Sequence, residues 1–174
     1  NIAVVIDTAR AGNLFFLTLF DQHPEVLSCP YMHYTYSYIV TLFGSEDELR
    51  TDAVQQVWPT ASYFRFVYHD PVGEIAAEIH RLGGTPDTSI DRAAVRRVFD
   101  GFLRNRKVIK RRELVGLTYV AYAAGIGRNL ESVRYLLLSD AISLRTEAVM
   151  AGFSGRVVDL AVKDFGDARL IHLV

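Results

Sequence analysis

The stretch DTARAGNLFFLTLFDQHPEV, residues 7–26, follows the apolar run IAVVI of residues 2–6. That continuous β-branched run predicts a strand buried on both faces, and residues 13–20 predict an apolar helix that ends before Pro24. Residues 26–29 then predict a second strand. The opening is therefore expected to be a strand–turn–helix–strand unit with parallel strands, which indicates an α/β fold.

The rest of the chain divides into a helical middle and a return to strand character near its end. Amphipathic spacing, capping residues and glycine stops set the expected bounds. Helices are expected over 42–57, 72–82, a segment capped by Ser89, 111–124 and 141–162 (with a break near 152–155), and strands over 133–138 and 168–174. Strands near both ends with helices between them predict an α/β sandwich with an inserted helical section.

Composition narrows the class of protein. The 174 residues, half of them hydrophobic, suit a single domain over residues 1–174. A net charge of −1 provides no general attraction to nucleic acid or to an anionic membrane, so neither is expected as a partner. No apolar run reaches the length of a membrane span and no signal peptide opens the chain, which predicts a cytoplasmic location. The single cysteine, Cys29, lies in an apolar segment and is expected to be buried.

The turn between the first strand and the first helix suits an anionic ligand. Backbone N–H groups and the positive helix end converge there, Arg10 adds a charge-assisted contact, and Gly12 allows a close approach. The stretch has neither GxxxxGK[ST] nor GxGxxG, which disfavours an ordinary ATP- or GTP-binding loop and a dinucleotide fingerprint. From the pattern alone, phosphate binding and a simple chain reversal both remain open.

Two separated parts of the chain have a more specific pattern. In the first part, Arg-x-Gly leads into an expected apolar helix and then into Asp-x-His-Pro-Glu-Val. The matching residues are Arg10, Gly12, Leu17, Leu19, Phe20, Asp21, His23, Pro24, Glu25 and Val26. The second part is the closing string DARLIHLV, residues 167–174. The first string resembles the start of the sulfotransferase family, and the second resembles the strand before that family's Arg-Asp-Pro-Arg motif.

The resemblance implies a P-loop-like three-layer sandwich with a central, mainly parallel sheet and an inserted helical section. In the family, an arginine and a serine after the last strand bind the 3′-phosphate of the donor. The corresponding positions fall beyond Val174, so the domain is expected to be truncated at its C-terminal end.

The resemblance also implies a reaction. The family moves a sulfuryl group from 3′-phosphoadenosine-5′-phosphosulfate (PAPS) to an acceptor, here expected to be a hydroxyl or amine of a carbohydrate or small molecule. The first turn holds the donor's 5′-phosphosulfate, a role that falls on Arg10, Ala11, Gly12, Asn13 and Leu14. Arg10 is also a catalytic candidate, because negative charge builds on the leaving oxygen and a cation stabilises it.

Sulfuryl transfer to a hydroxyl also needs a general base. Several sulfotransferases place it just beyond the second strand, a region that reads PYMHYTY over residues 30–36, and His33 is the candidate. The alternative is a histidine in a partly buried wall of tyrosines. His69 beside Asp70 is a second candidate, against a simple turn before Pro71. The five histidines and one cysteine lack metal-ligand spacing, so no metal is expected.

The run RNRKVIKRR, residues 104–112, has six basic residues in nine. It could attract a sulfated or acidic acceptor, or it could be a solvated connection between two helices. Its role is left open between these two interpretations.

Three functions follow from the sequence. A PAPS-dependent sulfotransferase is the first. Asn13 and Leu14 stand where the family has hydroxyl residues, which favours as the alternative a non-catalytic, sulfotransferase-like binding domain. The third, a P-loop-type kinase, requires a lysine that the turn lacks.

Overall fold

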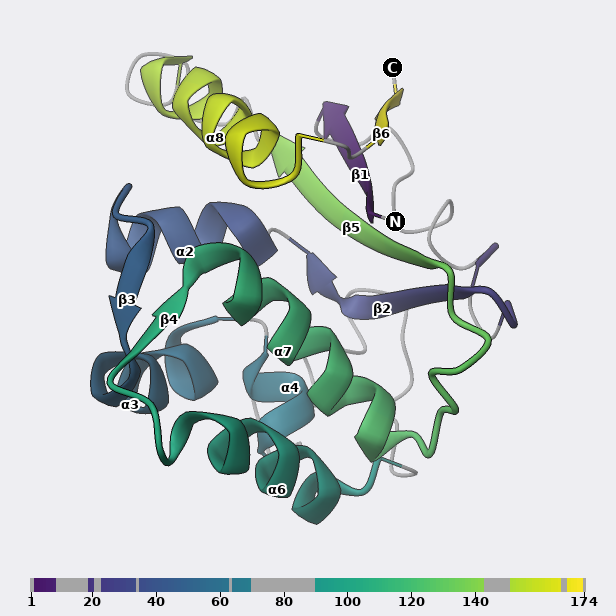
Figure 1. The fold of residues 1–174 in the computed structure, drawn as a ribbon. Coiled ribbons are helices and arrows are strands. Elements are labelled where there is room, and N and C mark those ends of the chain that lie inside the picture. Colours follow the sequence, from purple (N-terminus) through teal and green to yellow (C-terminus); the bar gives the residue numbers. More distant parts are fainter. Residues whose placement is uncertain are drawn as a thin grey trace. The chain divides into compact units, whose positions relative to one another are not determined.

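The computed structural model has a mixed α/β fold in two compact units. It describes residues 2–8, 19–20, 23–33, 35–62, 64–69, 90–142, 151–166 and 169–173. Unit 1 comprises Asn1–Asp47 and Glu131–Val174, and unit 2 comprises Glu48–Leu130. Unit 2 is thus inserted into the chain of unit 1, and Figure 1 labels the elements of both.

Unit 1 contains a sheet of parallel strands. Its members are β1 (Ile2–Thr8), β2 (Val26–His33), β5 (Tyr135–Ile142) and β6 (Arg169–Leu173). The spatial order is β2-β5-β1-β6, and each neighbouring pair runs parallel (Figure 1). Continuous apolar runs such as IAVVI suit such strands, because a parallel sheet is normally covered on both faces.

The predicted strands of unit 1 are confirmed, with longer bounds for some of them. Residues 2–6 and 26–29 fall inside β1 and β2, and residues 168–174 contain β6. Cys29 is buried, as expected, with 1% of its surface exposed. The three-layer P-loop-like arrangement stays a prediction.

The expected helix over 141–162 is wrong in two respects. Strand β5 continues to Ile142, and helix α8 spans Ala151–Asp164 without a break at residues 152–155. Glycine in a helix costs only about 1 kcal/mol relative to alanine. Burial of the side chains Val157 and Ala161 on α8 outweighs that cost.

Helix α2 (Thr35–Phe43) follows β2 and packs on β5 and α8. The buried Tyr36 hydroxyl donates a hydrogen bond of 2.5 Å to Asp164 Oδ2. Its ring meets Phe165 edge-on, with centroids 5.7 Å apart. These contacts hold α2 beside α8 within unit 1. No helix among the described residues of the chain is long and apolar enough to cross a membrane.

Unit 2 is mainly helical with one small antiparallel sheet. Its elements are β3 (Glu48–Arg50), α3 (Thr51–Ala61), α4 (Arg65–Tyr68), α6 (Arg92–Leu103), β4 (Val108–Lys110) and α7 (Arg111–Gly125). In the antiparallel ladder, Leu49 of β3 lies opposite Ile109 of β4, and both side chains are buried. Each short strand leads directly into a helix, α3 and α7 respectively.

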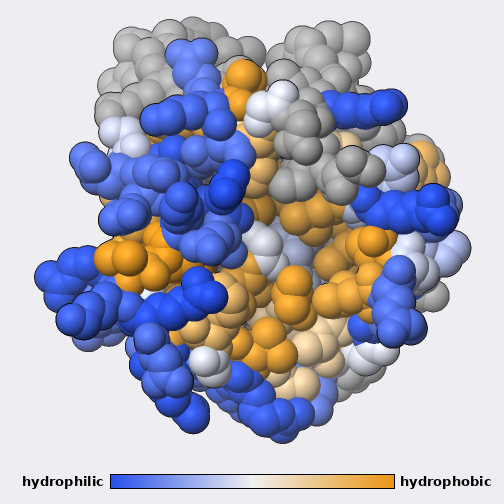
Figure 2. All heavy atoms as spheres, in the orientation of Figure 1, coloured by the Kyte–Doolittle hydropathy of each residue, from blue (hydrophilic) through white to orange (hydrophobic). Residues whose placement is uncertain are grey.

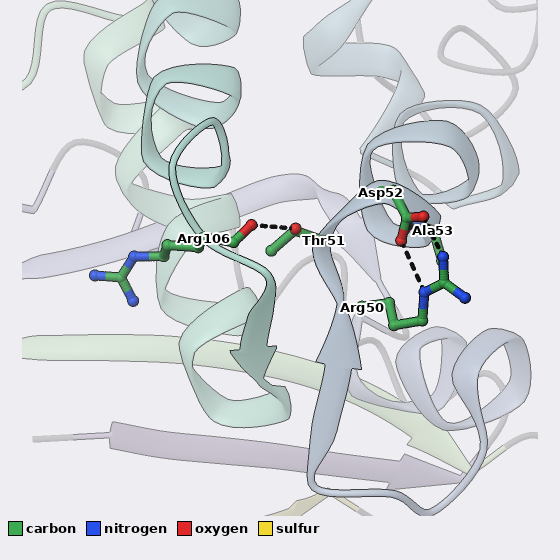
Figure 3. A network of polar contacts seen from close by, with 5 residues as sticks. All are labelled: Arg50, Thr51, Asp52, Ala53 and Arg106. Atoms are coloured by element: carbon green, nitrogen blue, oxygen red, sulfur yellow. Dashed lines mark hydrogen bonds and ion pairs between the residues drawn. The ribbon is translucent and has the colours of Figure 1, made fainter.

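A second set of contacts ties the start of α3 to the loop before β4. The Thr51 hydroxyl donates to the carbonyl oxygen of Arg106 at 2.5 Å, and the Thr51 N–H donates to the carbonyl of Lys107 at 3.1 Å. Figure 3 shows Thr51 pointing towards Arg106, with Arg50 and Asp52 paired beside it. The two strand–helix junctions are therefore joined by more than the ladder itself.

The expected helix over 42–57 is confirmed only in part, at residues 42–43 and 51–57, and wrong between them. Helix α2 ends at Phe43, and Gly44 follows with a φ of +78°, a backbone conformation that favours glycine. Residues 48–50 form β3 because they find a partner in β4, and α3 continues through Pro59 instead of ending there. Pro59 removes the one intrahelical hydrogen bond that its N–H would make to the Gln55 carbonyl, and burial of its side chain offsets part of that cost.

The other expected helices of unit 2 are partly confirmed. The prediction over 111–124 agrees with α7, and the expected helix over 72–82 lies outside the described residues. Asp91 caps α6, because its Oδ1 accepts a hydrogen bond of 3.0 Å from the Ala94 N–H. The cap assigned to Ser89 is therefore wrong.

Candidate functional site

The predicted donor-binding residues are Arg10, Ala11, Gly12, Asn13 and Leu14, and they lie outside the described residues. The structure describes the strand that leads to them. β1 lies between β5 and β6 and runs parallel to both. In open parallel sheets, ligands bind at the carboxyl ends of the strands. The segment after Thr8 therefore starts at the edge of the sheet where such a site is expected.

His33 is the last residue of β2 and is paired with Ser139 of β5. Ser139 lies beside Val5 of β1, and β5 continues past it to Ile142, which pairs with Thr8. The backbone of His33 thus lies short of the carboxyl end of β1 by about 10 Å along the strand direction, at about 3.3 Å per residue. β5 separates β2 from β1.

The register of β2 changes just before His33. Between the pair Ser28 with Leu137 and the pair His33 with Ser139, β2 advances by five residues and β5 by two. Pro30 lies in this irregular part of an edge strand and has no N–H to donate to a ladder. Bulges re-aim side chains and recur beside active sites. The sequence indicates the proline, but the size of the bulge depends on pairing with β5.

The His-Pro-Glu-Val string forms a turn that opens β2. The His23 N–H donates to the carbonyl of Phe20, and the Val26 N–H donates to the carbonyl of His23, each at 3.1 Å. His23 Nδ1 accepts a hydrogen bond of 3.2 Å from the Glu25 N–H. His23 therefore has a structural contact in the turn, in keeping with its position after the expected first helix.

The same turn is bonded to the segment before β5. The Ser132 hydroxyl donates to the carbonyl of Pro24 at 3.0 Å, and the Glu25 carbonyl accepts from the N–H groups of Arg134 and Tyr135 at 2.9 and 3.0 Å. Glu25 Oε1 also lies 3.1 Å from Arg134 Nε. Since β2 and β5 are parallel and both begin here, these contacts lie at the amino edge of the sheet.

In unit 2, several causes together raise the pKa of Tyr68. The Tyr68 hydroxyl donates to Asp100, at 2.9 Å to Oδ2 and 3.1 Å to Oδ1. Burial, followed by the hydrogen bond and the negative charge of Asp100, raises the pKa of Tyr68 to about 12. A tyrosine with that pKa stays protonated at neutral pH and is a poor general base.

Two arginines of α6 satisfy carbonyl groups at the end of α4. Arg92 Nε donates to the His69 carbonyl at 2.7 Å, and Arg96 Nη1 donates to the Tyr68 carbonyl at 2.9 Å. Carbonyls at the C-terminal end of a helix have no partners within the helix, so these arginines stabilise the end of α4. Asp70 lies outside the described residues, and the His69–Asp70 pair stays a prediction.

The basic run at 104–112 is mostly exposed. It crosses the turn after α6, the strand β4 and the first residues of α7, and among its cations Arg111 is the exception, with 0% of its surface exposed. The exposed cations are Arg104, Arg106, Lys107, Lys110 and Arg112. Their position between α6 and α7 agrees with a solvated connection, and attraction of an acidic ligand remains open.

An apolar cavity of about 490 Å³ lies between α6 and α7, within unit 2. Pockets of a few hundred to a thousand cubic ångströms lined mainly by apolar groups are typical of small-molecule sites. The lining residues are Val98, Phe102, Glu113, Gly116, Leu117 and Val120. Their spacing places them on one face of each helix, a pattern that can be read from the sequence. The cavity itself arises only where α6 packs on α7, so it could not be predicted from the sequence.

Gly116 is a notable lining residue, because nothing in its surroundings requires a glycine. A Cβ built there meets no atom within 4 Å, whereas one at Gly125 would come within 2.5 Å of Val95 Cγ2. Glycine in a helix interior costs about 1 kcal/mol relative to alanine. The described packing explains why residue 125 is a glycine, because a side chain there would clash with Val95. At Gly116 the packing requires no glycine, and the absence of a side chain leaves the cavity open.

Tyr68 predicts a pH dependence of stability. An unfolded tyrosine ionises near 10.0, while the folded Tyr68 ionises near 12. Between these values the unfolded state binds fewer protons, so the free energy of unfolding should fall as pH rises and should be unaffected below about 10. Tyr68→Phe should reduce this fall, as measured by urea unfolding at a series of pH values.

Tyr135→Phe is the matched control, because Tyr135 lies on β5 and is 39% exposed. The control should keep the wild-type pH profile. If wild type and Tyr68→Phe differ in free energy of unfolding by the same amount from pH 10 to 12, the raised pKa of Tyr68 is contradicted.

Comparisons with models of protein families, with curated proteins and with solved structures found no match. Among the described residues, no group of His, Cys, Asp and Glu side chains could hold a metal ion. Membership of the sulfotransferase family therefore stays a prediction that rests on the two matching strings, residues 7–26 and 167–174.

Proposed function

We propose that the chain is a PAPS-dependent sulfotransferase domain whose donor site is the turn after β1. The observation that supports this most directly is the position of β1 in the sheet. It has a parallel neighbour on each side, so β1 is an interior strand, and the Arg-Ala-Gly-Asn string follows its carboxyl end in the sequence. Crevices at that edge are where parallel sheets bind nucleotides.

The chemistry of the turn fits one end of the donor. Backbone N–H groups, Arg10 and Gly12 together provide positive potential and close access for a 5′-phosphosulfate. The same charge would stabilise the bridging oxygen as the sulfuryl group departs. His33, at the end of the irregular part of β2, is proposed as the general base that takes the acceptor's proton.

The donor site is tested by binding of 3′-phosphoadenosine 5′-phosphate to the 174-residue chain, measured by isothermal titration calorimetry. Arg10→Ala should weaken binding at least tenfold, because a charge-assisted hydrogen bond contributes about 1.5–3 kcal/mol. Adenosine, which has no 5′-phosphate, should bind far more weakly than the nucleotide.

Arg97→Ala is the matched control, since Arg97 is an exposed arginine on α6 in unit 2. Its binding should equal that of the wild type. Equal affinities for wild type and Arg10→Ala would count against the turn as the donor site. Tighter binding of ATP than of the adenosine bisphosphate would favour the P-loop-type kinase instead.

The role of His33 is tested by sulfuryl transfer from radiolabelled PAPS to a panel of hydroxyl and amine acceptors. His33→Gln should lower turnover by about 10²–10⁴-fold, the usual contribution of a general base, with nucleotide affinity unchanged. His23→Gln is the control, because His23 lies in the turn at the other edge of the sheet. Full turnover in His33→Gln would remove His33 from the mechanism.

The second candidate is a non-catalytic, sulfotransferase-like binding domain. Asn13 and Leu14 support it, because the leucine can offer a phosphate only its backbone N–H. If this candidate is right, wild type should show no transfer to any acceptor, and Asn13→Ser with Leu14→Thr should raise nucleotide affinity about tenfold, the effect of one added hydrogen bond to a charged group. Transfer by the wild type would exclude it.

A further inference from the structure

The described residues that line the cavity between α6 and α7 all belong to unit 2, and none of them is a residue of the proposed donor site. Figure 2 shows hydrophobic side chains gathered over α7 and towards α6, with hydrophilic residues around them. Val120 at its border is 40% exposed, so apolar surface there remains open to solvent. An apolar hollow of about 490 Å³ is large enough for a small molecule with an alkyl or aryl body.

At one end of the cavity, positively charged side chains outnumber negatively charged ones. The Arg106 guanidinium lies 3.9 Å from the ring centroid of Phe102, a lining residue, and is exposed. Glu113 is the lining carboxylate, and it is already engaged. Its Oε2 accepts a hydrogen bond of 2.9 Å from the Lys110 N–H, and its Oε1 lies 3.7 Å from Arg106.

Further exposed cations surround that end. The first turn of α7 and the strand before it contribute Arg112 and Lys110, and the turn after α6 contributes Arg104 and Lys107. Against these five cations stand two carboxylates, the partly neutralised Glu113 and the exposed Glu48, which lies opposite Lys110 in the β3–β4 ladder. The local charge is therefore positive in a chain whose net charge is −1, which favours an anionic group at this end.

We propose that this cavity binds an anionic amphiphile, with its alkyl or aryl body between α6 and α7 and its carboxylate, sulfate or phosphate near Arg106. The apolar lining accounts for the body, and the surplus of cations accounts for the head group. Gly116 leaves room for the body where a side chain would intrude. The proposal does not depend on the sulfotransferase assignment.

Decanoate is the probe, titrated into the 174-residue chain while methyl NMR shifts of Val98 and Val120 are followed. Saturable shifts confined to the cavity methyls are expected. Decyltrimethylammonium, which has the same chain length and the opposite charge, should bind at least tenfold more weakly. Equal binding of the two probes, or no saturable shift with decanoate, would overturn the proposal.

Gly116→Leu should block the cavity. It should weaken decanoate binding about tenfold, which corresponds to roughly two methylene groups kept out of the hollow. Gly101→Leu is the matched control, because Gly101 is also a helical glycine with nothing within 4 Å of a built Cβ, but it does not line the cavity. Both variants replace a helical glycine and should raise the urea midpoint of unfolding. Loss of decanoate binding in Gly116→Leu alone would therefore result from the filled cavity and not from a change in stability. Equal binding in both variants would contradict the site.

Two charge variants test the head group. Arg106→Gln should weaken decanoate binding about threefold, as for an exposed ion pair, and added salt should reduce the difference. Glu113→Gln should strengthen binding by a similar factor, since glutamine can still accept from the Lys110 N–H while the repulsion is removed. Weaker binding by Glu113→Gln would show that the head group lies elsewhere and would overturn the orientation.

A membrane surface is the other source of anionic amphiphiles. The same variants are therefore tested for sedimentation with phosphatidylserine vesicles. Decanoate binding without sedimentation supports a free amphiphile as the ligand. Sedimentation that Gly116→Leu leaves unchanged, without cavity shifts from decanoate, would replace the proposal with adsorption of the basic surface to the membrane.

Discussion

The parallel pairing of β1 with β5 and β6 is the constraint on which unit 1 depends. A buried strand needs partners for its backbone N–H and C=O groups, and β1 finds them on strands near the other end of the chain. Parallel neighbours also require crossover connections. The chain therefore leaves the sheet and returns, and unit 2 occupies one of these excursions. Residues distant in sequence are in this way brought to the same carboxyl edge.

Unit 2 depends on a contact of the same non-local kind between its two strand–helix junctions. Leu49 lies opposite Ile109 in the ladder, and Trp58 Nε1 donates a buried hydrogen bond of 3.0 Å to the Thr118 hydroxyl. These contacts hold α3 against α7 from one side. The Asp91 N–H donates to the carbonyl at the end of α7, which joins α6 to it. The cavity lies on the face of α7 towards α6, and along α7 it is lined by Glu113, Gly116, Leu117 and Val120.

The sequence predicts those elements whose signal is local. A continuous apolar run sufficed for β1, and the largely apolar Leu-Ile-His-Leu string sufficed for β6. Gly125 and Gly127 marked the end of α7, where Gly127 has a φ of +65°. β3 was missed because Glu-Leu-Arg has no local strand signal; it becomes a strand only through pairing with β4. The expected break in α8 is absent for a related reason, since burial of α8 side chains outweighs the weak preference of glycine against helix.

For the candidate site, the structure describes the second half of the first matching string, residues 23–26. His23 and Glu25 form a turn at the amino edge of the sheet, bonded to the segment before β5. Arg10 follows β1 in the sequence, just after Thr8 at the carboxyl edge, and lies outside the described residues. The likeness of the His-Pro-Glu-Val string to the sulfotransferases thus bears on how β2 begins, because its residues are used in folding contacts. The proposed donor binding rests instead on Arg10 and its neighbours, and a chain could keep the folding contacts of His23 and Glu25 while losing a donor site.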